Sequence, residues 1–145
     1  MSKIRFKLIP EVHLVLRRSS HFLMLRRYQS GYMDGYYSVV AGHVDGNEAF
    51  RSAMVREANE EAGIIIKHEE LKLVHTMHRR SDEERLSLFF EAAKWEGNIR
   101  NMEPHKCDDL NWYRLEEQDT LMVPYVKLAL TCISKDVSYS EFGWS

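Results

Sequence analysis

Apolar and polar positions alternate along several segments of this chain, and this two-residue period is typical of half-buried β-strands. The first two such segments flank a polar turn at residues 18–20, which predicts a β-hairpin. The predicted strands comprise residues 5–17 (interrupted at Pro10), 21–28, 36–41, 71–79, 86–93 and 110–115. The chain is therefore predicted to be rich in strands.

Two other segments are predicted to be helices. The first covers residues 45–62, with Asp45 or Asn47 as the N-cap and Gly63 in the left-handed position that ends it. The second covers residues 124–135 and opens with a proline, which is favoured in the first helical turn. The sequence thus predicts one mixed α/β domain.

The first predicted helix carries three carboxylates on one face, because Glu57, Glu60 and Glu61 are spaced i, i+3 and i+4. Like charges at this spacing repel, so the cluster needs either surrounding water or a positive charge between its members. The N-terminal half of the same face is apolar and is expected to pack on the protein body, through Phe50, Ala53 and Met54. The carboxylates are therefore expected to line a cleft; a solvated acidic face is the alternative. Oxygen ligands of this kind suit Mg²⁺, or Mn²⁺, better than zinc.

Residues 42–64 read GHVDGNEAFRSAMVREANEEAGI, and this segment resembles the Nudix box. The box pattern is G-x5-E-x7-R-E-U-x-E-E-x-G-U, in which U is a bulky aliphatic residue. Every fixed position is present at the right spacing, namely Gly42, Glu48, Arg56, Glu57, Glu60, Glu61 and Gly63, with Ile64 at the last U. Ala58 stands at the first U and is smaller than usual, which affects packing rather than chemistry. The resemblance implies the Nudix fold, an α/β/α sandwich with a central mixed β-sheet.

The resemblance also implies a metal site. In this family the box glutamates and a backbone carbonyl just before the box glycine bind divalent cations. Carried over, the ligands are Glu57 and Glu61 directly, Glu60 often through water, and the carbonyl of Ala41. The catalytic group of the box is then Arg56, Glu57, Glu60 and Glu61.

A further metal-binding carboxylate is assigned by the resemblance to Glu103, from its offset after the Trp-Glu-Gly run at residues 95–97. The general base stays open among Glu57, Glu60 and Glu103. The rival carboxylates for the additional ligand are Glu83, Glu84 and Glu96, for which plain surface charge is the simpler interpretation.

Other polar residues are candidates for holding the substrate or the loop around it. Arg56 and Glu48 are expected to brace the loop against the helix. Arg27, Arg85 and His43 are candidates for binding substrate phosphates, with a surface position as the alternative for each arginine and loop capping for His43. Aromatic faces for a base are offered by Tyr28, Tyr32, Tyr36, Tyr37, Trp112 and Tyr113, although core packing explains any single one as well.

Composition limits the remaining choices. At 145 residues the chain is predicted to be a single domain over 1–145, and its net charge of −2 predicts no basic surface for nucleic acid. Two cysteines are too few for a disulfide framework, and no apolar stretch approaches 18 residues, so a cytoplasmic protein without a membrane span is expected. The low-charge, aromatic segment 139–144 is expected to dock on the body or on a second subunit, or to be a disordered end. The expected state is a monomer or homodimer.

The resemblance implies a Mg²⁺-dependent enzyme that hydrolyses a nucleoside diphosphate linked to another moiety, X. A (d)NTP cleaved to NMP and pyrophosphate, in a nucleotide-pool housecleaning role, is the favoured substrate. A nucleotide-sugar or ADP-ribose pyrophosphatase is the alternative. An RNA cap hydrolase is a further rival, disfavoured because such enzymes usually work with added RNA-binding elements, for which a compact, near-neutral chain leaves little room. A non-catalytic nucleotide-binding module is disfavoured because every box glutamate is intact.

Overall fold

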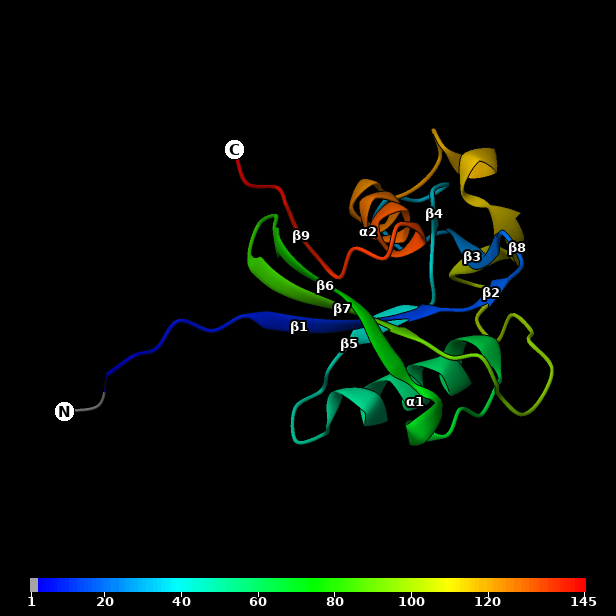
Figure 1. The fold of residues 1–145 in the computed structure, drawn as a ribbon, viewed down its shortest axis with the longest axis horizontal. Helices are drawn as coiled ribbons and strands as arrows, with labels where there is room; N and C mark the ends of the chain where they lie inside the picture. The colour runs from blue at the N-terminus through cyan, green and yellow to red at the C-terminus, as the bar shows by residue number, and fades with distance from the viewer. Residues whose placement is uncertain (1–2) are drawn as a thin grey trace.

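The computed structural model describes residues 3–145, and in these it contains two β-sheets and two α-helices (Figure 1). The first sheet has the strand order β5-β1-β7-β6-β9. Its strands are β1 (Ile9–Val15), β5 (Ala41–His43), β6 (Lys72–Arg80), β7 (Glu84–Glu91) and β9 (Tyr139–Phe142). β1 pairs in parallel with β7, and β6 with β9, whereas the other neighbours are antiparallel, so the sheet is mixed.

The second sheet is smaller and antiparallel. Its strands are β2 (Arg17–Arg18), β3 (His21–Arg27), β4 (Tyr37–Ser38) and β8 (Cys107–Arg114). β2 and β3 form a hairpin with the turn at residues 19–20, so the hairpin is predicted correctly only at its closed end. Most of the rest of the predicted strand 5–17 is β1, which belongs to the first sheet and pairs with β5 and β7 instead. The single strand predicted over 36–41 is wrong, because the chain leaves β4 in one sheet and enters β5 in the other. A uniformly apolar segment does not reveal such a change of sheet.

The helices α1 (Phe50–Ala62) and α2 (Pro124–Ser134) lie on opposite faces of the first sheet (Figure 1). Alternate residues of β1 separate the two apolar clusters, because Val12 and Leu14 pack with α1 while Val15 packs with α2. Short 3₁₀ helices cover His68–Glu70 and Leu115–Gln118. This arrangement is the predicted α/β/α sandwich. None of the helices described between residues 3 and 145 is long and apolar enough to cross a membrane.

Two expectations about α1 need correction. The helix begins at Phe50 with Ala49 as its N-cap, so neither Asp45 nor Asn47 caps it, and Ala49 offers no side-chain acceptor to the first turn. Asp45 and Asn47 belong to the preceding loop instead. Ala53 is fully buried, as predicted for the apolar half-face, but the side chain of Phe50 is 40% exposed at the start of the helix. The predicted end is confirmed: Gly63 has a φ of 70° and its N–H donates to the carbonyl of Asn59.

The two ends of the chain behave differently. The strand predicted from residue 5 begins only at Ile9, and residues 3–8 are extended but belong to no strand. The C-terminal segment docks on the body, since β9 pairs with β6 and the indole of Trp144 donates to the carbonyl of His78 over 3.1 Å. His75 secures this contact by hydrogen bonds to the Val137 carbonyl and the Ser140 hydroxyl. The aromatic character of the segment is therefore explained by docking.

Candidate active site

A cleft of about 890 Å³ lies where α1, β1, β5 and the β6–β7 turn meet. It brings together residues that the sequence predicts from five separate parts of the chain. These are Arg27, Ala41, Gly42, His43, Glu57, Glu60, Glu61, Arg85 and Glu103. The rivals Glu83, Glu84 and Glu96 do not line this cleft. The structure thus places the residues of the box beside the candidate phosphate ligands, while their roles stay predictions.

Glu57 and Glu61 form the acidic wall of the cleft. They share a hydrogen bond, and the charges of Glu57 and Glu103 also act on Glu61. Burial first, and these acidic neighbours second, raise the pKa of the Glu61 carboxyl well above its usual range. A carboxyl in this position holds a proton unless a cation joins the cluster.

Gly42 is required by the position of Glu57. A Cβ atom added at residue 42 would lie 2.1 Å from the carboxyl carbon of Glu57, well inside van der Waals contact. The backbone of β5 therefore passes directly against this carboxylate. The neighbouring backbone of Ala41 also hydrogen-bonds to Glu61. The first residue of the box accordingly sets how closely β5 and α1 approach each other at the cleft.

Arg56 is the positive centre of the acidic region. Its guanidinium contacts Glu48 at 3.1 Å and Glu57 at 2.9 Å, and it reaches Glu60 at 3.4 Å. It also donates to the carbonyl of His43, so the contacts that the predicted brace requires are present. The hydrogen bonds that Arg56 donates to Glu48 first, and to Glu57, together with the charges of these carboxylates, raise the pKa of Arg56, which keeps it charged. Glu60 is the most exposed of the three box carboxylates on the helix face, with 52% of its side chain accessible.

Arg79 and Arg85 form a cationic wall around Glu11. The Glu11 carboxylate receives hydrogen bonds from Arg79 at 2.6 Å and from Arg85 at 3.2 Å. Burial acts to raise the pKa of Glu11, but the combined charges of His13, Arg79 and Arg85 and the hydrogen bond from Arg79 lower it overall. One buried carboxylate thus holds two arginines at the cleft, and Arg85 also contacts His43 at 3.1 Å.

Arg27 lies at the cleft, and its role in binding a phosphate stays a prediction. Its guanidinium donates to the Tyr32 carbonyl at 2.5 Å and to the Ser30 hydroxyl at 3.1 Å. Asp34 accepts hydrogen bonds from the same loop, at the backbone of Ser30 and Gly31. Arg27 therefore organises the loop that carries Tyr32 to the edge of the cleft.

Several residues of the site were missed by the sequence analysis. Arg79, Tyr125, Glu11 and His13 all line the cleft. The side chain of His13 is fully buried, contacts the Tyr125 hydroxyl at 2.8 Å, and burial lowers its pKa to about 4. A signal was available for two of them, because Glu11 and His13 alternate with the apolar residues of the first predicted strand. Two polar residues on the inner face of a strand indicate a polar site or cavity.

The positions of the aromatic residues exclude most of them from stacking on a base in this cleft. Only Tyr32, of the six predicted from the sequence, lines the cleft. Tyr37 and Tyr113 instead donate to the Asp109 carboxylate, and Trp112 packs against Trp95. Core packing or surface position therefore accounts for those that lie away from the cleft.

The donor set of the cleft fits a hard divalent cation. In residues 3–145 no group of three His, Cys, Asp or Glu side chains is already gathered as a metal site. Glu57 and Glu60 are instead turned to Arg56. A cation is favoured because the carboxyl of Glu61 is buried beside two other carboxylates, Glu57 and Glu103.

The comparison with known families agrees with this geometry. The model of the NUDIX domain matches residues 7–128, which is most of the chain. The chain therefore belongs to the NUDIX family.

Particular relatives are more distant. The chain is 25% identical over 118 residues to the "NAD-capped RNA hydrolase NudC" of Escherichia coli O157:H7, a match that covers 81% of this chain and 44% of that protein. The chain thus spans under half the length of the curated relatives it matches. In structure it is similar to a MutT NUDIX hydrolase from Burkholderia pseudomallei, with a TM-score of 0.77 at 21% identity, covering 87% and 98% of the two chains.

A third similarity concerns a larger enzyme. It is a bifunctional NMN adenylyltransferase/ADP ribose pyrophosphatase from Francisella tularensis, complexed with AMP and a manganese ion. The TM-score is 0.71 at 15% identity, and the match covers 90% of this chain and 42% of that one. At these identities the similarities show a shared fold.

Proposed function

We propose that this protein is a Mg²⁺-dependent pyrophosphohydrolase that cleaves a nucleoside diphosphate linked to X, most favourably a (d)NTP to NMP and pyrophosphate. The observation that carries the proposal is one cleft lined by both a carboxylate cluster and arginines. Glu57, Glu61 and Glu103 line it together with Arg79 and Arg85. This combination suits a polyphosphate, which needs positive charge on every side.

Glu57 and Glu61 would hold the metal directly, with Glu60, Glu103 and the Ala41 carbonyl as further ligands. A bound divalent cation supplies neutralisation of the phosphate charge and acidifies a water molecule. The presence of Mn²⁺ in the adenylyltransferase/pyrophosphatase neighbour supports a divalent metal here.

The other residues have supporting roles in this proposal. Gly42 leaves room for the Glu57 carboxylate, and Arg56 with Glu48 fixes the loop before α1. Arg85, held by Glu11 beside His43, is proposed to bind a substrate phosphate. Arg27 is proposed to act through the loop of residues 30–34, whose conformation it holds.

A substrate panel tests the proposal. The purified protein is assayed with Mg²⁺ against dNTPs, oxidised dNTPs, NDP-sugars, ADP-ribose, NADH and dinucleoside polyphosphates, with release of phosphate or pyrophosphate as the readout. Turnover of a triphosphate to NMP and pyrophosphate is expected. Preference for ADP-ribose or an NDP-sugar would favour the alternative substrate class. Nucleotide-dependent thermal stabilisation without turnover would instead identify a binding module.

A further inference from the structure

Residues 3–8 form an extended arm that projects from the body at the N-terminal end of β1 (Figure 1). Its sequence, KIRFKL, alternates basic and apolar residues, so an extended backbone places the two kinds on opposite faces. The apolar face is not covered: Ile4 is 96% exposed, Phe6 70% and Leu8 37%. In the part of the chain that the structure describes, Ile4 and Phe6 are the two most exposed large apolar side chains.

The arm is exposed because neither neighbour of β1, β5 or β7, extends far enough to pair with residues 3–8. The ladder with β7 begins at the pair Ile9–Arg85, and preceding residues of β7 turn back toward β6. The ladder with β5 ends at the pair Glu11–His43, with one last hydrogen bond from Val44 to the Pro10 carbonyl. The backbone groups of residues 3–8 therefore remain available to another strand.

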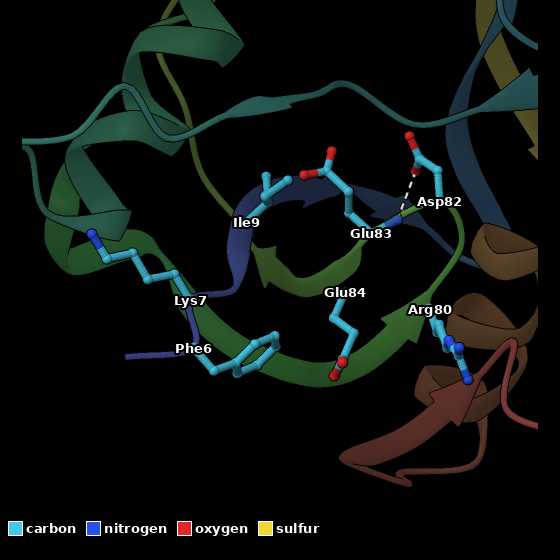
Figure 2. A pocket seen from close by; sticks show the side chains of 7 residues that line it. All are labelled: Phe6, Lys7, Ile9, Arg80, Asp82, Glu83 and Glu84. Carbon is cyan, nitrogen blue, oxygen red and sulfur yellow. Dashed lines mark hydrogen bonds between the residues drawn. The ribbon is translucent and has the colours of Figure 1, made fainter. Parts of the chain in front are cut away.

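An acidic turn lies beside the arm. Asp82, Glu83 and Glu84 share a cavity of about 310 Å³ with Phe6 and Lys7 of the arm. Figure 2 shows the arm residues on one side of this cavity and the acidic residues of the β6–β7 turn across from them. Arg85 approaches Asp82 and Glu83 only at 3.6 and 3.7 Å and is also shared with Glu11. Glu84 lies 3.1 Å from His78, and Arg80 lines the same cavity, so these basic groups offset only part of the charge of the three carboxylates.

We propose that the arm is a dimerisation element, which pairs antiparallel with the arm of a second copy of this chain about a two-fold axis at Phe6. This register places Phe6 opposite Phe6 and Ile4 opposite Leu8, so the apolar residues of the two arms all meet on one face. A register centred on Arg5 leaves Leu8 without an apolar partner and places Arg5 opposite itself.

The acidic turn explains how the other face tolerates its charge. In the proposed register Arg5 of one copy lies opposite Lys7 of the other, and like charges at that spacing repel. The turn of each copy, at residues 82–84, lies beside Phe6 and Lys7 and offsets this repulsion. The apolar pattern, which is self-complementary about Phe6, therefore favours a second copy of the chain, whose basic arm comes close to the same acidic turn.

Analytical ultracentrifugation of the full chain from about 1 to 200 µM tests the proposal. The wild type is expected to shift from monomer to dimer mass with rising concentration. Phe6→Ser should move the midpoint at least tenfold upward, and the triple change Asp82→Asn, Glu83→Gln, Glu84→Gln should weaken association in the same direction. Ile65→Ser is the matched control, because Ile65 is another exposed apolar side chain, 53% accessible, far from the arm in sequence. At a concentration where the wild type is monomeric, the melting temperature of Phe6→Ser should equal that of the wild type, since Phe6 belongs to no core cluster.

Cross-linking tests the register. Under mild oxidation Phe6→Cys is expected to form a disulfide-linked dimer with itself, whereas Ile4→Cys and Leu8→Cys should cross-link only when mixed. The wild type, with Cys107 and Cys132, measures the background.

Three outcomes would overturn the proposal. They are a wild type that stays monomeric throughout, a Phe6→Ser variant that dimerises like the wild type, and a monomer whose arm instead confers binding to anionic vesicles. Because these readouts do not use turnover, they are independent of the substrate panel.

Discussion

At the scale of single residues, the site depends on two close approaches. One is between the backbone of residue 42 and a carboxylate, and the other is between neighbouring carboxylates. Gly42 is in contact with Glu57, and Glu61 is buried against its acidic neighbours. The sequence motif predicts that these residue types matter. It does not explain why residue 42 is a glycine. The explanation is the close contact between the backbone of β5 and the side chain of Glu57 in α1, which only the structure shows.

Gly42→Ala should lower kcat/KM about 10²-fold, because the new methyl group displaces the Glu57 carboxylate by an ångström or more. Steady-state kinetics with the best substrate of the panel measures it. Gly46→Ala is the control, since a Cβ at that position meets no atom within 4 Å although its φ is +82°. The control should lose about 1 kcal/mol of stability with activity retained. Equal activity losses in the two variants would refute the explanation.

Glu61→Gln should abolish the stabilisation of the protein by Mg²⁺ and lower the rate of hydrolysis by a factor of order 10³.

The raised pKa of Glu61 also determines how the stability of the metal-free protein depends on pH. The folded state binds the Glu61 proton more tightly than the unfolded state, so this contribution to stability is present below pH about 4.5 and is lost as pH rises through the elevated value. Metal-free Glu61→Gln should therefore be more stable than the wild type at alkaline pH. Melting curves with and without Mg²⁺ test both points, and a Mg²⁺ shift retained in the variant would contradict the ligand role.

At the scale of elements, local patterns predicted most helices and strands, and the errors have physical causes. The end of α1 at Gly63 and the proline at the start of α2 follow from backbone preferences alone. The start of α1 was misplaced because Asp45 and Asn47 have the chemistry of caps but belong to a loop that Arg56 holds. The sequence also did not predict that two of the Arg27 donors hold the loop of residues 30–34. Competition among nearby partners is not visible in sequence spacing.

Ala49→Ser should stabilise the protein by about 1 kcal/mol, because α1 lacks a side-chain cap and Ala49 already has the extended conformation of an N-cap. Urea unfolding at neutral pH measures the change. Ala49→Val serves as the comparison, since it adds a side chain at the same exposed position without an acceptor oxygen. A gain of the same size in both variants would show that capping is not its cause.

At the scale of the whole molecule, β1 joins the layers and the cleft. Its even-numbered residues Val12 and Leu14 face α1, while His13 reaches α2 through Tyr125. The box in the sequence identified the acidic wall, but the cationic wall comes from β1 and the β6–β7 hairpin, which have no comparable motif. Long-range pairing of strands brings these parts together, which is why Arg79 and Glu11 could not be assigned from local sequence.

Acid should destabilise the protein partly through His13. The pKa of this histidine is lowered from 6.5 to about 4 in the folded state, so its contribution is complete above pH 6.5 and is lost as pH falls toward 4. The loss is about 3 kcal/mol for a shift of this size. Denaturant unfolding at pH 7 and pH 4 should show a smaller pH dependence in His13→Gln than in the wild type. An unchanged dependence would exclude His13 as the source.

The parallel pairing of β9 with β6 has a consequence for the order in which the protein can be completed. Strand β6 is synthesised well before β9, and roughly sixty residues separate them. At a ribosomal rate of about 5–20 residues per second, the outer edge of β6 waits several seconds for its partner. A nascent chain that stops short of residue 139 would expose that edge to other chains. When β9 pairs with β6, it covers this edge, and the newly synthesised sheet no longer exposes β6 to aggregation.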